Sequence, residues 1–526
     1  MRRAGVGLWL AAIVVGAALL RFAALDFGAG FEARPDERNV VMTLREMDAG
    51  RAITPLLVGY GGGYFYPTYV ITRLAARRAG FPTLEAWIAA DEHGATVVAR
   101  AWSALLSTLT VALTFGAAWS LAGAEAGLVA AGALAGSTLA VREAHFAKAD
   151  AAAAFFAALL VTALTRRWHR PDVRALALGA AAALTLSTKG CVGFLPAVAL
   201  ALAWPDGQHW PRPNLRALAL GGVTLVALFP ALNPFWITSF TTTLTWARAV
   251  IGSVSDTSYL AGGTAHVPGP LRYHADVSLR FGCGLVVAVL ALPSLALGLM
   301  RGGAARWVAV AVLGYWAILA ASPMVLARFF LPSVPALAVL TGVLVAEGVS
   351  WTGRSALRVP LALLGMSILV AEPLANSVTL VRLLSRADTR ELAGAWVAAH
   401  ATPLAPIVSW GAPPGAIDYG RPPLEGHPVL QRLAPERWGS SGASLLVHHH
   451  HPLPWSSDPL PPAGRSLRVL AVFDPFDGNV RRAVFEPLDA FYLPLAHFAG
   501  IARPGPRIVI AALEAAPAAP VRDGRR

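Results

Sequence analysis

Two adjacent carboxylates, Asp36 and Glu37, follow shortly after an apolar segment at residues 4–25, and Arg34 stands two positions before them. Charge so close to a hydrocarbon layer is expensive unless it lies among lipid headgroups or in a water-filled cavity, so the pair is a candidate functional site. A carboxylate in such a place can act as a general base toward a hydroxyl. The alternative is an ordinary solvated loop in which Pro35 and Asp36 begin a helix.

A second group of candidates occupies the turn at residues 142–150, which contains His145, Lys148 and Asp150. The chain has only two lysines, Lys148 and Lys189, and both stand at predicted outer ends of apolar spans. Lysine offers a compact point charge of the kind that suits a phosphate contact. Chance placement, or a lysine that extends to the membrane interface, is the alternative.

Arg328, at the start of a later span, is a third cation on the same predicted face, and its alternative role is an interfacial anchor. Together the cations would hold a lipid-linked phosphate, while a carboxylate would take the proton of an incoming hydroxyl. The phosphate is then the leaving group.

The composition places this chemistry in a membrane. Hydrophobic residues make up 56% of the 526 residues and charged residues 14%, against about 45–50% and about 25% in soluble domains. The formal net charge is +13, but the basic residues are scattered between apolar runs. Anionic lipid headgroups are therefore a better counter-charge than nucleic acid.

The apolar runs predict a mainly α polytopic helical bundle of about 11 spans. After the last span, short strand-like runs that alternate with a helical segment predict a soluble α/β domain. We expect a transmembrane domain at residues 1–375 with outer loops at 26–94 and 233–280, and an extracytoplasmic domain at 376–526. The predicted spans are residues 4–25, 97–121, 125–141, 151–165, 176–188, 190–204, 215–232, 282–300, 307–321, 329–349 and 357–371.

The arginines predict the orientation. Arg2 and Arg3 precede the first span, and the short loops that alternation assigns to the same side are basic, as the positive-inside rule requires. We therefore expect a multi-pass protein of the cell inner (plasma) membrane with a cytoplasmic N-terminus. In the first outer loop, residues 37–47 and 64–79 have the spacing of interfacial amphipathic helices. The glycine-rich run at 59–63 is interpreted as a hinge.

The order of four short motifs resembles the GT-C glycosyltransferases, in particular the family 39-like group of bacterial protein O-mannosyltransferases and lipid A aminoarabinose transferases. The motifs are Asp-Glu at 36–37, His-Phe-Ala-Lys-Ala-Asp at 145–150, Ser-Thr-Lys-Gly at 187–190 and Ala-Arg-Phe-Phe-Leu-Pro at 327–332. The resemblance implies transfer of a sugar from a polyprenyl-phosphate donor to a hydroxyl of a lipid, glycan or protein on the outer face, with inversion.

Carried over to this sequence, the resemblance makes Asp36 the general base, with Glu37 orienting it or binding substrate. His145 and Asp150 would line the same cavity, and the donor phosphate would face Lys148, Lys189 and Arg328. Where some aminoarabinose transferases have Lys-Pro, this chain has Tyr66-Pro67-Thr68, so the donor sugar stays open. The remaining substrate-binding candidates are Arg34, Tyr66 and, on the acceptor side, His266 and Arg272.

Two other classes of function would leave different signs in the sequence. A transporter or lipid flippase would show internal repeats and charges near mid-membrane, and a binding scaffold would not need the carboxylate. No cofactor is expected, with a divalent metal as the less favoured alternative. His448 to His451 are interpreted as a solvated strand end, because adjacent strand residues point to opposite faces. Cys191 and Cys283 are interpreted as small core residues.

Overall fold

The computed structural model describes most of the chain, in eleven stretches: residues 3–28, 35–50, 59–204, 212–255, 269–353, 357–412, 415–420, 424–453, 456–460, 467–486 and 491–513. Its contacts divide it into a helical domain, Met1–Leu25 with Asp36–Val381, and a C-terminal domain, Asp26–Pro35 with Arg382–Arg526. Arg34 and His266, two of the predicted substrate-binding residues, lie outside the described residues.

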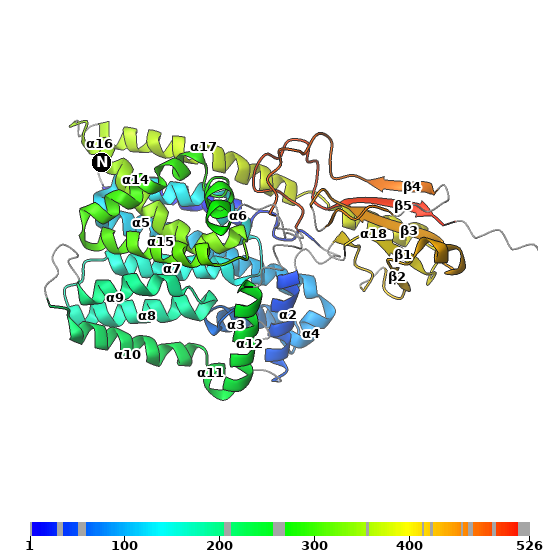
Figure 1. Ribbon diagram of the computed structural model, residues 1–526, viewed down its shortest axis with the longest axis horizontal. Coiled ribbons are helices and arrows are strands. Elements are labelled where there is room, and N and C mark those ends of the chain that lie inside the picture. Colours follow the sequence, from blue (N-terminus) through cyan, green and yellow to red (C-terminus); the bar gives the residue numbers. More distant parts are fainter. Residues whose placement is uncertain are drawn as a thin grey trace, which may run out of the picture. The chain divides into compact units, whose positions relative to one another are not determined.

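The long helices of the helical domain run along a common direction (Figure 1). Each predicted span coincides with one of them. They are α1 (Arg3–Phe22), α5 (Glu92–Gly136), α7 (Ala149–Thr165), α8 (Pro171–Lys189), α9 (Leu195–Ala203), α10 (Leu215–Leu232), α14 (Leu285–Arg301), α15 (Gly303–Ala321), α16 (Val334–Ser350) and α17 (Arg358–Leu384).

Helix α5 contains two of the predicted spans, because the chain leaves helical geometry at Ala122 and at Gly123, whose φ is +87°. Among the described residues, six helices are long and apolar enough to cross a membrane by length and composition, and three shorter apolar helices accompany them. The mainly helical multi-pass architecture is confirmed, whereas fewer helices than the predicted 11 meet the full length for a crossing.

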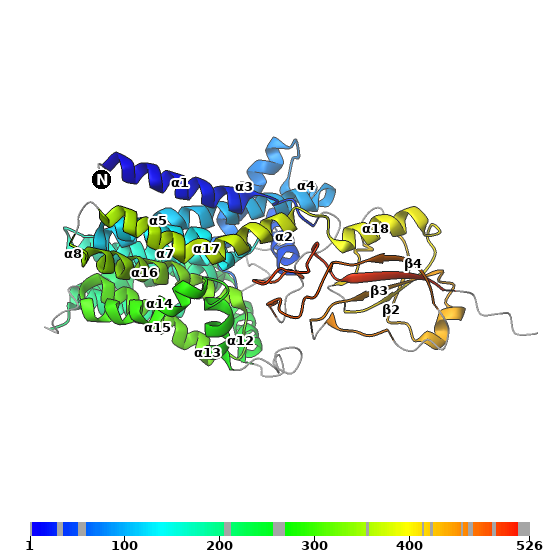
Figure 2. The same cartoon turned by 90° about the horizontal axis from the view of Figure 1, so that it is seen from above.

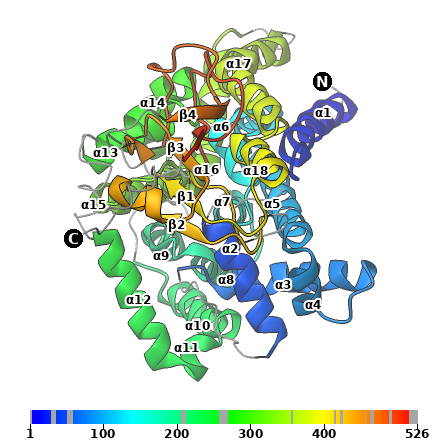
Figure 3. The same cartoon turned by 90° about the vertical axis from the view of Figure 1, so that its right-hand side faces the viewer.

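Shorter helices surround the ends of the bundle. Helices α2 and α12 run across the bundle direction and are seen lengthwise in Figure 3, as expected for interfacial helices. The shorter elements of this domain are α2 (Pro35–Asp48), α3 (Gly62–Arg78), α4 (Leu84–Ala90), α6 (Thr138–Ala144), α11 (Phe235–Thr238), α12 (Phe240–Ser255), α13 (Pro270–Tyr273), the single-turn η1 (Val192–Phe194), the π-helix η3 (His274–Leu279) and the 3-10 helix η4 (Ala327–Ser333).

A buried arginine joins α1 to α5. Arg21 is fully buried, and it donates from Nε to Ser107 Oγ at 2.8 Å and from Nη2 to the carbonyl of Leu134 at 3.1 Å. A charge inside an apolar bundle is tolerated where its donors all find acceptors. Arg21 therefore holds the first helix against both halves of α5.

The C-terminal domain carries a five-stranded mixed sheet with helix α18 (Thr389–His400) packed against it (Figure 2). The strand order is β2-β1-β3-β5-β4, with β1 parallel to β2 and β3, and β5 antiparallel to β3 and β4. The strands are β1 (Ile407–Trp410), β2 (Val429–Gln431), β3 (Leu445–His450), β4 (Arg468–Phe473) and β5 (Arg507–Ala512), and η7 (Pro435–Ser440) precedes β3. This domain confirms the predicted α/β class.

The histidine run is not a solvated strand end, and that interpretation was wrong. His449 of β3 and His451, directly after the strand, are fully buried, and His448 and His450 are half-buried on the other face of β3. His449 Nε2 contacts the carbonyl of Ala412 at 2.7 Å, and the His451 ring packs against Tyr492. The alternation of faces was predicted, but the covering of one face by distant segments was not.

Burial makes the C-terminal domain sensitive to acid. Desolvation lowers the pKa of His449 to about 4 and that of His451 to about 3, while an unfolded histidine has a pKa of about 6.5. Below that value the unfolded chain binds protons that the folded domain does not, so the free energy of unfolding falls as the pH drops from about 6.5 to about 4. We expect a loss on the order of 2 kcal/mol for each histidine.

Hydrogen exchange of β3 and β5 in the full chain, measured between pH 7 and 4.5, checks this prediction. His449→Gln should weaken the pH dependence and leave the share of His451, whereas replacing the exposed His400 by Gln should leave it unchanged. Equal profiles for the native chain and His449→Gln would contradict the assignment.

Candidate functional site

Glu37 is a buried anchor of the first turn of α2. It forms a two-point ion pair with Arg100 of α5, whose Nε and Nη2 each lie 2.8 Å from a Glu37 oxygen. The backbone N–H of Ala147 donates to the same carboxylate at 2.8 Å. Glu37 therefore ties α2 to α5 and to the turn before α7. Only about a twentieth of its side chain is exposed.

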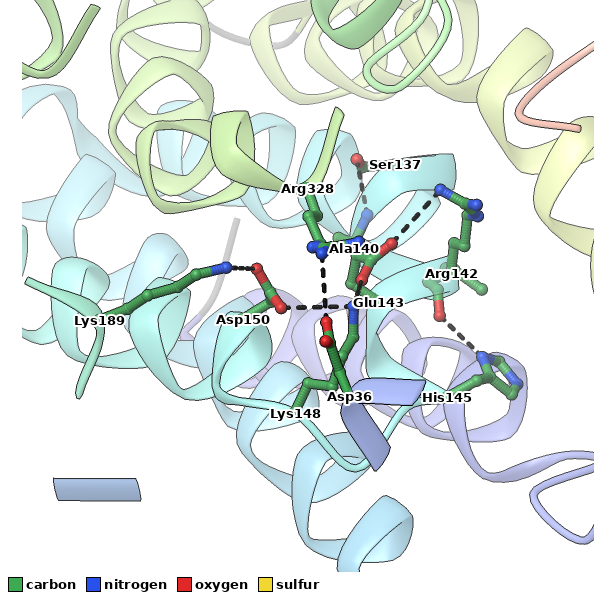
Figure 4. A network of polar contacts seen from close by, with 11 residues as sticks. Asp36, Ser137, Ala140, Arg142, Glu143, His145, Lys148, Asp150, Lys189 and Arg328 are labelled. Carbon is green, nitrogen blue, oxygen red and sulfur yellow. Dashed lines mark hydrogen bonds and ion pairs between the residues drawn. The ribbon is translucent and has the colours of Figure 1, made fainter. Parts of the chain in front are cut away.

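That neighbour, Asp36, remains accessible. About a third of its side chain is exposed, and Arg328 Nη2 lies 3.1 Å from its Oδ2 (Figure 4). Arg328 comes from η4, 292 positions further along the chain, and its side chain is 16% exposed. The fold thus places an accessible carboxylate beside an accessible guanidinium.

A separate chain of alternating charges lies in the interior of the same domain. Lys148 Nζ lies 3.1 Å from Glu143 Oε2 and 3.5 Å from Asp150 Oδ2, and Arg142 Nη1 lies 3.4 Å from Glu143 Oε1. Asp150 also pairs with Lys189 (Figure 4). All of these side chains are buried except Lys189, which is 15% exposed. Because each buried charge has an opposite neighbour, the chain is a rigid support that presents Lys189 at its end.

Local structure explains why Lys189 and Asp150 meet. Lys189 is the last residue of α8, where the helix dipole favours a cation, and Gly190 ends the helix with a φ of +60°. Asp150 lies in the first turn of α7, where the dipole favours an anion. The end of one helix and the start of its neighbour therefore carry complementary charges.

Aromatic rings fill the space between the two accessible cations. Lys189 Nζ lies 4.8 Å from the ring centre of Phe329 and 5.8 Å from that of Tyr60, and Arg328 lies 5.8 Å from Phe329. Burial, with the nearby charges of Asp36 and Asp150, raises the pKa of Tyr60 well above its ordinary value. Tyr60 therefore stays a neutral phenol that can donate a hydrogen bond beside both cations.

Tyr60 and Arg100 were missed by sequence reasoning. Tyr60 stands inside the glycine-rich run, which was interpreted as a hinge. Arg100 is a lone charge inside a predicted span, and such a residue calls for a buried partner. That signal was available in the sequence, although nothing in it named Glu37 as the partner.

The glycine-rich run is a close-packing surface, so its interpretation as a hinge was wrong. A Cβ on Gly61 would lie 2.0 Å from the carbonyl oxygen of Ser187, and one on Gly62 would lie 2.0 Å from that of Leu232. The Gly61 N–H donates to the carbonyl of Thr188 at 3.0 Å. Only glycine lets the backbone approach α8 this closely, which is what brings Tyr60 to Lys189.

An open apolar groove of about 470 Å³ begins on α8 less than two turns before Lys189. Leu184 of α8 and Tyr66 of α3 line it, so Tyr66 faces hydrocarbon side chains. The other lining residues are Gly62, Gly63, Pro67, Val70, Ile71, Phe156 and Leu232.

Two predicted site residues do not join the cluster. His145 is fully buried, and its two ring nitrogens contact the carbonyls of Val141 and Ala23 at 2.8 and 3.0 Å. Its contacts make it a link between α1 and α6. Arg272 is 72% exposed and pairs with Asp276 one turn away. In the part of the chain that the structure describes, no group of three His, Cys, Asp or Glu side chains is placed to hold a metal ion.

Residues 91–236 match the protein family described as dolichyl-phosphate-mannose-protein mannosyltransferase. The predicted resemblance to this glycosyltransferase group is confirmed. The predicted enzyme class, a glycosyltransferase, is confirmed with it. The matched segment contains Lys148, Asp150 and Lys189, whereas Asp36 and Arg328 lie outside it. No curated protein matches the chain.

Among solved structures, ArnT from Cupriavidus metallidurans is similar in its apo state (17% identity, TM-score 0.49, 96% of this chain and 97% of that one). The structure of ArnT bound to undecaprenyl phosphate is similar to the same degree (18% identity, TM-score 0.49, 96% and 98%). The oligosaccharyltransferase of Archaeoglobus fulgidus in its apo form is also similar (10% identity, TM-score 0.49, 84% and 69%).

Proposed function

We propose that this chain transfers a sugar from a polyprenyl-phosphate donor to an acceptor hydroxyl, with inversion at the sugar. The observation that carries the proposal is the contact between Asp36 and Arg328, with Lys189 held beside the same aromatic ring. A base for the acceptor and two cations for the leaving phosphate are the groups that such a transfer needs.

In the proposed step, Asp36 takes the proton of the acceptor hydroxyl as its oxygen forms a bond to the anomeric carbon. The bond between that carbon and the phosphate oxygen breaks, and its electron pair leaves with the polyprenyl phosphate. Lys189 and Arg328 stabilise the negative charge that develops there. Glu37 and Arg100 fix the turn that carries Asp36, and Lys148 with Asp150 fixes Lys189.

The apolar groove next to Lys189 suits the hydrocarbon part of the donor. Its volume of about 470 Å³ is within the range of ligand pockets, and its lining has almost no polar surface. A chain of isoprene units lying there would place its phosphate near Lys189. We assign Tyr66 to this role, and we place the cluster on the outer membrane face because the short basic loops lie at the other ends of the spans.

Lys189→Met is expected to raise the KM for the polyprenyl-phosphate donor about 10–100-fold, because a charged hydrogen bond contributes about 1.5–3 kcal/mol. Initial rates with purified protein in liposomes and graded donor concentrations measure this. Arg216→Met is the matched control, since Arg216 is 79% exposed and pairs with Asp172 at the start of α8. An unchanged KM in folded Lys189→Met would remove Lys189 from the donor site.

A further inference from the structure

We propose a second binding site in the helical domain, for the phosphate of an anionic phospholipid, at the end of the bundle opposite the charged cluster. An open cavity of about 460 Å³ lies there, between the end of α7, the start of α8, and the α14–α15 connection. Helix α7 begins next to Asp150 and ends at this cavity, so about 20–25 Å separates the two places. This site does not depend on the proposed transferase function.

The lining of the cavity is strongly basic. Four arginines line it, namely Arg166, Arg167, Arg174 and Arg301, and the described lining contains no acidic residue. Arg301 pairs with Glu347 and donates to the carbonyl of Leu121, and Arg174 donates to the carbonyl of Ala201. These contacts hold two of the arginines in place at the cavity wall.

The other two arginines, Arg166 and Arg167, are not held by such contacts among the described residues. Among the described residues, no carboxylate lies within ion-pair distance of Arg166 or Arg167, and both side chains are exposed. Arg166 lies over the ring of Trp168 at 5.0 Å, which orients its guanidinium. Two exposed guanidiniums at the mouth of a basic cavity, with no ion pair to any carboxylate in the described part of the chain, attract a phosphate strongly, because a guanidinium donates to phosphate in a fork.

Backbone donors add to this attraction. Gly302 and Gly303 line the cavity with φ of +73° and +56°, and α15, 19 residues long, begins there without a side-chain cap. The first N–H groups of a helix have no partner within it, and they carry the positive end of the helix dipole. An anion in the cavity can therefore accept hydrogen bonds from the backbone as well as from the arginines.

The surroundings favour a lipid headgroup over a free anion. Leu121, Leu164 and Trp168 share the lining with the arginines, and Met300, next to Arg301, is 81% exposed. Trp119 on α5, one position before Ser120 of the cavity lining, is 45% exposed. Tryptophan and arginine at the ends of apolar helices are typical of the lipid headgroup layer, where side chains contact both phosphate groups and hydrocarbon.

The test measures displacement of a fluorescent phosphatidylglycerol from the purified full chain in neutral detergent. We expect the native chain to bind phosphatidylglycerol and not phosphatidylcholine, and the double variant Arg166→Gln/Arg167→Gln to bind it at least about tenfold more weakly. The matched control, Arg170→Gln/Arg212→Gln, removes two exposed arginines that do not line the cavity and should change the affinity less than twofold.

Three outcomes would overturn the proposal. An equal loss in the control would show that net charge alone attracts the lipid, and equal binding of phosphatidylcholine would remove the phosphate specificity. Displacement by millimolar inorganic phosphate would show a site for a free anion. Unfolding midpoints measured without added lipid confirm that the variants are folded, so a loss of binding reports on the site itself.

Discussion

Asp36→Asn is expected to lower the rate of sugar transfer by about 10²–10⁴-fold, the usual contribution of a positioned general base. Asparagine keeps the size of the side chain and can still contact Arg328, but it cannot take a proton from the acceptor. The donor KM should change little, because the cations that face the phosphate remain. Transfer of labelled sugar by equal amounts of purified protein in liposomes measures the effect.

The matched control is Asp91→Asn. Asp91 is an exposed carboxylate that accepts from the N–H of Gly94 at the start of α5, and asparagine caps a helix equally well. This variant should retain the native rate. Transfer by Asp36→Asn at the rate of the control would exclude Asp36 as the base.

Glu37→Gln is expected to destabilise the helical domain by about 3–5 kcal/mol, because it leaves the buried Arg100 without a counter-charge. The double variant Glu37→Leu/Arg100→Leu should recover much of that loss, since replacing a buried pair with apolar side chains is often neutral. Unfolding midpoints in detergent, measured for Glu37→Leu, Arg100→Leu and the double variant, give the coupling between the two residues.

Losses that simply add in the double variant would show that Glu37 and Arg100 act independently. The same variants also distinguish a residue that holds Asp36 in place from a residue that takes part in the reaction. In Glu37→Leu/Arg100→Leu, the remaining transfer should depend on Asp36 as it does in the native chain, because we propose that Glu37 fixes the turn that carries Asp36 and leaves the reaction itself to Asp36.

The helices were predictable because long apolar runs in a bilayer have one solution, a helix that satisfies its own backbone. The break between the two parts of α5 at Gly123 and the end of α8 at Gly190 follow from glycine positions in the same way. The α/β class of the C-terminal domain followed from short strand-like runs that alternate with one helical segment.

The different burial of Asp36 and Glu37 could not be worked out from the residues alone, because the two are neighbours in sequence and only the fold separates them. Arg100, 63 positions away, buries one of them, and Arg328, 292 positions away, contacts the other. His145 was misjudged for a similar reason. Its ring nitrogens contact backbone carbonyls, and no side-chain motif reveals such partners.

The proposed transfer is tested most directly with a polyprenyl-phosphate sugar, labelled in both sugar and phosphate, that is incubated with the purified chain in sealed liposomes. We expect the two labels to separate: free polyprenyl phosphate accumulates, and the sugar appears on an acceptor with inverted anomeric configuration. A donor that stays intact, or that only moves between the two leaflets, would exclude sugar transfer and favour a transporter.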